Sequence, residues 1–136
     1  MGILVVDANL IGALFVQSDQ SPLATRIFEK DADWYAPLLW QRKMRSLITS
    51  YLRHQLINLE KATQIMDEAH ALMIEHERFV SSHLVLELVS TSKCKSYDYQ
   101  YVALAKEMNL TLVPFDKQVV RAFPGIAVFP HGVPSI

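Results

Sequence analysis

The sequence has little of what defines the more specialised classes of protein. Its single cysteine, Cys94, can form no internal disulfide and has no second cysteine with which to build a metal knuckle. The longest clean apolar stretch, Leu10 to Val16, is far below the ~18 residues that span a bilayer. There is no repeat, no low-complexity tract and no linker. These absences argue against a disulfide scaffold and a helical membrane protein.

No charge of one sign dominates either. The sequence contains 13 Lys and Arg residues and 14 Asp and Glu residues, which gives a formal net charge of −1. Of the 136 residues, 51% are hydrophobic. This is the composition of a globular protein, of a size that can bury a core. The first residues, MGILVVD, contain no basic leader. We therefore expect one domain over residues 1–136, in the cytoplasm.

Short β-branched runs alternate with amphipathic stretches along the chain. The predicted strands are residues 3–6, 34–36, 110–113 and 125–129, and the predicted helices are residues 9–17, 21–31, 38–52, 58–77, 81–89, 97–109 and 115–123. We place Ser96 as the N-cap of the helix that contains Asp98. The pattern predicts an α/β fold: a short parallel sheet of about four to five strands, helices on both faces and a helical hairpin insertion.

Three aspartates stand where such a sheet places its ligands. Asp7 ends the first strand, Asp98 opens a helix, and Asp116 follows a later strand, so all three are expected beyond the carboxyl ends of the strands. Each one alone is more simply explained as a helix cap. Together, carboxylates that repel one another form a site for a hard cation such as Mg²⁺ or Mn²⁺. A cation held there suits metal-assisted hydrolysis of nucleic acid.

Three segments of the chain carry a more specific pattern: VVDANLIGALF, APLLWQRKMRSLITSYL and SYDYQYVALAKEMNLTLVPFDKQVVRAFP. They resemble the PIN-domain family, in particular the VapC-like toxin ribonucleases of toxin–antitoxin pairs. In that family one acid ends the first strand, another begins a YDAxYVALA-like helix, and another follows an LVTxD-like strand. Asp7, Asp98 and Asp116 match these positions. The resemblance implies a PIN fold, Mg²⁺ or Mn²⁺, an RNA substrate, a cognate antitoxin and homodimers.

Two positions depart from the family pattern. Where the family has a glutamate in its third helix, in a pattern like APLLWRSEFRN, this chain has Lys43, and Pro114 replaces the hydroxyl residue of LVTxD. An ammonium group among carboxylates would compete with a divalent ion, because like charges ~4 Å apart repel by several kcal/mol at protein-like dielectric. Lys43 either neutralises the acidic site from within or extends to solvent and leaves the aspartates to a metal. The sequence leaves both interpretations open.

Two hypotheses about function follow. The first is a toxin-type, divalent-metal-dependent endoribonuclease, with Asp7, Asp98 and Asp116 as metal ligands and catalytic residues and Lys43 at the family's glutamate position. The second is a catalytically inactive PIN-like module that binds RNA or a protein partner, with Lys43 as its internal counter-charge.

Other features fit RNA binding but have simpler explanations. The segment from Trp34 to Leu59 contains no acid, and its basic strip follows either an RNA backbone or a solvated helix face. The members of this strip are Arg42, Lys43, Arg45 and Arg53. Asn9 orients Asp7 or makes a local turn hydrogen bond. Tyr97, Tyr99 and Tyr101 are candidates for base stacking, although at least one of them is expected in the core.

Overall fold

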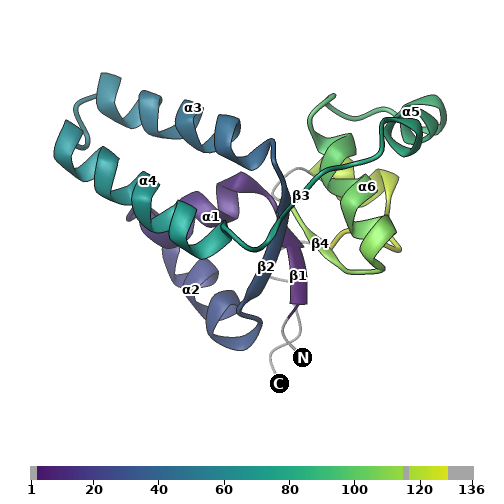
Figure 1. The fold of residues 1–136 in the computed structure, drawn as a ribbon, viewed down its shortest axis with the longest axis horizontal. Coiled ribbons are helices and arrows are strands. Elements are labelled where there is room, and N and C mark those ends of the chain that lie inside the picture. Colours follow the sequence, from purple (N-terminus) through teal and green to yellow (C-terminus); the bar gives the residue numbers. More distant parts are fainter. Residues whose placement is uncertain (1–2, 115–116, 129–136) are drawn as a thin grey trace.

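A computed structural model describes residues 3–114 and 117–128 (Figure 1). In chain order the elements are β1 (Ile3–Val6), α1 (Ala8–Phe15), α2 (Ser21–Lys30), β2 (Asp33–Pro37), α3 (Trp40–Arg53), α4 (Leu59–Met73), β3 (Glu77–Arg78), α5 (Ser82–Thr91), α6 (Asp98–Met108), β4 (Leu112–Val113) and α7 (Lys117–Ala122).

The sheet is parallel and has the strand order β3-β2-β1-β4. Val5 of β1 pairs with Tyr35 on one side and with Leu112 on the other. Because β1 is covered on both faces, Val5 and Val6 are completely buried, as is typical of a central parallel strand. All strands end at the same edge of the sheet, so the residues that follow them are brought together there.

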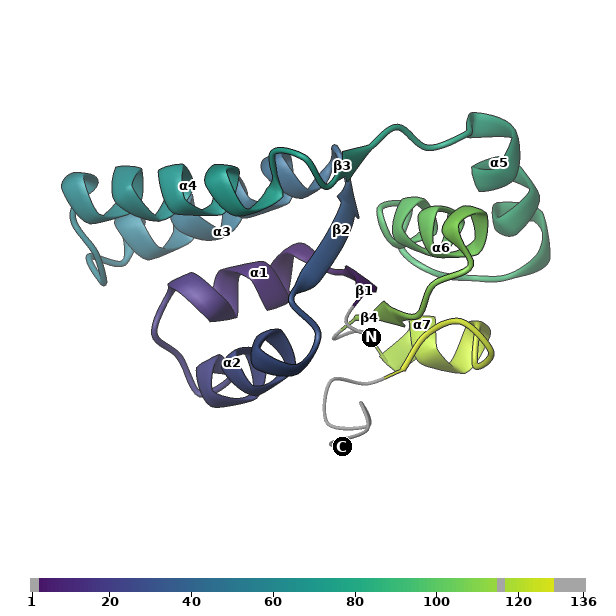
Figure 2. The same ribbon diagram turned by 60° about the horizontal axis from the view of Figure 1, so that its bottom comes forward.

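Helices cover both faces of the sheet (Figures 1 and 2). Both views place α1 and α2 on one side of β1 and β2, with α6 on the other side. Helices α3 and α4 contact each other and form a hairpin that extends beyond the sheet. The α/β fold, the parallel sheet and the helical hairpin are as the sequence predicted.

Three predicted details are wrong. The helix expected over residues 58–77 ends at Met73; residues 74–76 form a turn, and Glu77 begins β3, where it pairs with Ala36. The N-cap of α6 is not Ser96 but Tyr97, which makes no capping side-chain bond. In place of a strand over residues 125–129, Ala127 forms an isolated bridge to Leu112 after a turn. Residue 129 lies outside the described residues.

The core lies between the sheet and its helices. Trp34 of β2 and Trp40 of α3 are buried, and α4 contributes a stripe of buried residues at helical spacing. The members of that stripe are Ala62, Ile65, Ala69 and Met73. Within the described part of the chain, no helix is long and apolar enough to cross a membrane.

Helices α1 and α3 pack closely at Gly12. A Cβ atom at this position would clash with Leu47 Cδ2. The missing side chain lets α3, which carries Lys43, pack closely against α1, which Asp7 caps.

We predict that Gly12→Ala lowers the free energy of unfolding by about 1 kcal/mol, because the added methyl group displaces Leu47. In a Leu47→Ala background the same change should stabilise the protein, since alanine exceeds glycine in helix propensity by about 1 kcal/mol. Urea unfolding of both single variants and the double variant measures the coupling. Additive effects of the two substitutions would contradict this account of the contact.

Candidate functional site

Asp7 lies at the junction of β1 and α1. Its backbone N–H donates to the carbonyl of Val113 in β4, 3.3 Å away, which holds the residue at the sheet edge. Its side chain caps α1, because Oδ1 accepts from the backbone N–H of Asn9 at 3.3 Å. The carboxylate is 4% exposed. Asp7 is thus a helix cap and also a buried negative charge, which needs a positive partner.

Lys43 supplies that partner from α3. Its Nζ lies 2.9 Å from Asp7 Oδ1, and the two side chains are 21% and 5% exposed. The ammonium group also lies 5.1 Å from the centre of the Tyr101 ring, within the range of a cation–π contact. Lys43 does not extend to solvent. Its side chain points to the carboxyl edge of the sheet, and neutralisation of the whole acidic site by Lys43 stays a prediction.

Asp98 lies in the first turn of α6 and is 6% exposed. It lines the same pocket as Asp7 and Lys43. Two of the three predicted aspartates therefore meet at one edge of the sheet. Asp116, the third, lies outside the described residues.

Tyr101 is buried beside both aspartates. Burial raises the pKa of its hydroxyl well above the ordinary value of 10.0, and the charges of Asp7 and Asp98 raise it further, although the backbone of Ala8 acts in the opposite direction. The hydroxyl is consequently neutral at physiological pH. A neutral hydroxyl adds no third negative charge beside Asp7 and Asp98.

A pocket of about 480 Å³ surrounds these groups. It is lined by Asp7, Asn9, Lys43, Lys95, Asp98, Lys117 and Gln118. The sequence reasoning missed Lys95, Lys117 and Gln118. Lys95 lies just before α6, and Lys117 begins α7. The sequence did contain a signal for them, because Lys95 lies close to Asp98 and Lys117 follows Asp116.

The described residues do not fit a divalent metal ion while Lys43 holds this position. One oxygen of Asp7 already accepts from the ammonium group, whose charge would repel an ion bound to the same carboxylate. Over residues 3–114 and 117–128, no group of three or more His, Cys, Asp or Glu side chains is arranged to hold a metal. Joint metal binding by Asp7, Asp98 and Asp116 stays a prediction.

The three tyrosines have different environments. Tyr99 and Tyr101 are 4% and 1% exposed and belong to the core, whereas Tyr97 is 47% exposed. The Tyr99 hydroxyl donates to the carbonyl of Ser92 and accepts from the N–H of Cys94, which ties the loop before α6 to that helix. The expectation that at least one tyrosine lies in the core is confirmed, and Tyr97 is left for a surface role.

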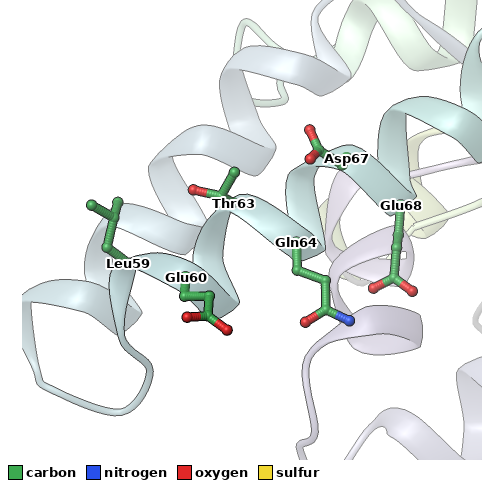
Figure 3. A pocket seen from close by; sticks show the side chains of 6 residues that line it. All are labelled: Leu59, Glu60, Thr63, Gln64, Asp67 and Glu68. Atoms are coloured by element: carbon green, nitrogen blue, oxygen red, sulfur yellow. The ribbon is translucent and has the colours of Figure 1, made fainter.

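A hollow of about 610 Å³ lies on the outer face of α4. Figure 3 shows its lining side chains, which all come from that helix: Leu59, Glu60, Thr63, Gln64, Asp67 and Glu68. Its charged groups are carboxylates on an open surface. It therefore lacks the combination of cations and buried acids found at the sheet edge.

We predict that Tyr101 makes the protein less stable at high pH. Above pH 10.0 the unfolded chain loses the phenol proton while the folded chain keeps it, so the free energy of unfolding falls by up to about 1.4 kcal/mol per pH unit. Tyr101→Phe should remove this part of the slope, measured by urea unfolding from pH 9 to about 11. Tyr97→Phe is the control, and an equal slope in wild type and Tyr101→Phe would refute the assignment.

No family model matches the chain. Ribonuclease VapC3 of Pyrobaculum aerophilum is 25% identical to it over 130 residues, which cover 90% of this chain and 96% of that protein.

Two solved structures share the fold. The crystal structure of FitAcB from Neisseria gonorrhoeae matches with a TM-score of 0.75 and 14% identity, over 96% of this chain and 99% of that one. The crystal structure of PAE2754 from Pyrobaculum aerophilum matches with a TM-score of 0.69 and 16% identity, over 96% and 93% of the two chains. The chain therefore has the PIN-type α/β fold that its sequence predicted, and it is similar over most of its length to a VapC ribonuclease.

Proposed function

We propose that this chain is a VapC-like PIN module that binds RNA and whose divalent-metal-dependent ribonuclease activity is suppressed by Lys43. The observation that carries the proposal is the 2.9 Å ion pair between Lys43 Nζ and Asp7 Oδ1. Similarity to a protein described as a ribonuclease supports RNA as the ligand. The lysine occupies the position at which the resemblance calls for a glutamate.

Electrostatics explains why the lysine would keep a metal out. Opposite unit charges ~4 Å apart attract by roughly 4 kcal/mol near a protein surface, and Asp7 is buried enough to need this neutralisation. A divalent ion could bind to Asp7 only if the ammonium group moved away, because the two positive charges repel each other at the same carboxylate. Lys43 would thus do from within the chain what an antitoxin arginine is thought to do in related toxins.

A second candidate, the metal-dependent toxin endoribonuclease, is favoured by the similarity to Ribonuclease VapC3. In this case Lys43, which is 21% exposed, would turn to solvent and Asp7, Asp98 and Asp116 would hold Mg²⁺ or Mn²⁺. The partners that accompany either candidate are RNA, a cognate antitoxin and a second copy of the chain. All three are proposals from the resemblance.

We predict that wild type gives no binding heat when Mn²⁺ is titrated into it up to millimolar concentration, and that Lys43→Glu binds Mn²⁺. The substitution removes the competing cation and adds a carboxylate oxygen, the ligand type that Mg²⁺ and Mn²⁺ prefer. Isothermal titration calorimetry measures the difference. Lys61→Glu, which makes the same charge change at an exposed position of α4, should behave like wild type.

Cleavage of RNA distinguishes the two candidates. We predict that wild type leaves a mixed-sequence RNA intact in Mn²⁺, and that any cleavage gained by Lys43→Glu is lost again in Lys43→Glu with Asp98→Asn, because Asp98 lines the same pocket. If wild type binds Mn²⁺ and cuts RNA, and Asp98→Asn abolishes both, suppression by Lys43 is wrong and the chain is a metal-dependent ribonuclease.

A further inference from the structure

A second pocket adjoins the acidic one. It has a volume of about 440 Å³ and is lined by Asn9, Arg42, Lys43, Ser46, Leu47, Ser50 and Tyr97. Because Asn9 and Lys43 line both pockets, the two are neighbours: the acidic one lies at the sheet edge and the second lies beside α3. The size of the second pocket falls within the ~300–1,000 Å³ of small-molecule sites, which is room for one nucleotide unit.

The walls of this second pocket differ in chemistry. Residues of α3 with helical spacing supply one wall, with the cations Arg42 and Lys43 and the hydroxyls Ser46 and Ser50. Tyr97, at the start of α6, supplies an aromatic ring that is 47% exposed. The position of this ring beside two cations suits a ligand that has both a flat apolar face and a negative charge.

The loop before Tyr97 is held in place. The Tyr99 hydroxyl binds the backbone of Ser92 at 2.7 Å and of Cys94 at 2.9 Å, and the N–H of Asp98 donates to the carbonyl of Lys95 at 3.0 Å. These bonds fix the backbone on both sides of Tyr97. The backbone that carries Tyr97 therefore loses little freedom on binding, which favours affinity.

Charge selects the kind of ligand. Among the residues that line the second pocket there is no carboxylate, and the neighbouring acidic pocket sets the cations Lys43, Lys95 and Lys117 against the carboxylates Asp7 and Asp98. The hollow on α4, by contrast, carries Glu60, Asp67 and Glu68 (Figure 3). A polyanion is attracted to the first surface and repelled by the second.

We propose that the two neighbouring pockets bind single-stranded RNA without a metal ion. A base stacks on Tyr97, and the neighbouring phosphates contact Arg42 and the lysines of the acidic pocket. The proposal rests on the RNA-binding role given above and adds the residues that perform it. Lys43 then has two tasks: it neutralises Asp7, and its remaining N–H groups donate to the phosphate that a metal ion would otherwise meet.

The test uses the full chain and a fluorescein-labelled (rA)8 oligonucleotide, with fluorescence anisotropy measured in EDTA. Wild type should bind, Tyr97→Ala should bind about tenfold more weakly, and Tyr97→Phe should bind like wild type, because phenylalanine keeps the stacking face. Phe79→Ala is the matched control, since Phe79 is 87% exposed and lines neither pocket. Circular dichroism checks that each variant is folded.

The contribution of Arg42 is separated by salt. Arg42→Gln should weaken binding at every sequence tested and lower the slope of log Kd against log salt by about one. Arg53→Gln, at the far end of the same helix, should leave that slope unchanged. The same titration with single-stranded (dA)8 tests whether the 2′-hydroxyl is needed. Equal binding of DNA and RNA indicates base stacking and phosphate contact alone, whereas weaker binding of DNA indicates contact with the 2′-hydroxyl.

The outcomes separate the subsite from the proposed function. If wild type binds RNA in EDTA but Tyr97→Ala and Arg42→Gln bind equally well, the subsite is wrong and RNA binding stands. If wild type binds RNA only when Mn²⁺ is present, the metal-free subsite and suppression by Lys43 both fail. If neither condition gives binding but a peptide partner is captured through Tyr97, the pocket is a protein site and the RNA proposal is overturned.

Discussion

One ion pair, between the Lys43 ammonium group and the Asp7 carboxylate, decides what the acidic edge of this sheet can do. Asp7 is buried because β1 is the central strand and because the residue caps α1. A buried carboxylate requires a positive partner. In a site built for a divalent ion that partner arrives from solution, whereas here it is covalently part of α3 and lies 2.9 Å away.

The rest of the fold keeps this pair together. The contact at Gly12 brings α3 close to α1, and β4 holds Asp7 through the Val113 carbonyl. Tyr101 lies beside both acids with a raised pKa and stays neutral, so it does not compete for the lysine. The two neighbouring pockets are also lined by the Tyr97 ring and by several cations, among them Arg42 and Lys117. This lining is consistent with a nucleic-acid ligand that binds without a metal ion.

The sequence predicted the fold well because the apolar residues of its long helices recur at helical spacing and its buried strands are short runs of β-branched residues. It missed β3 because a two-residue strand of charged residues, Glu77 and Arg78, owes its conformation to pairing with β2. The predicted topology alone was enough to place Asp7 and Asp98 at one edge of the sheet. It did not decide where Lys43 points, since a long side chain at the border of an apolar stripe can turn either way, nor did it find Lys95 and Lys117, which reach the pocket through tertiary packing.

The most direct test of the central claim is a crystal structure of wild type soaked in MnCl₂, with anomalous diffraction recorded to locate manganese. Our account expects the Lys43 ammonium within hydrogen-bond distance of Asp7 and no anomalous peak between Asp7 and Asp98. A manganese peak coordinated by these carboxylates, with Lys43 turned to solvent, would contradict it.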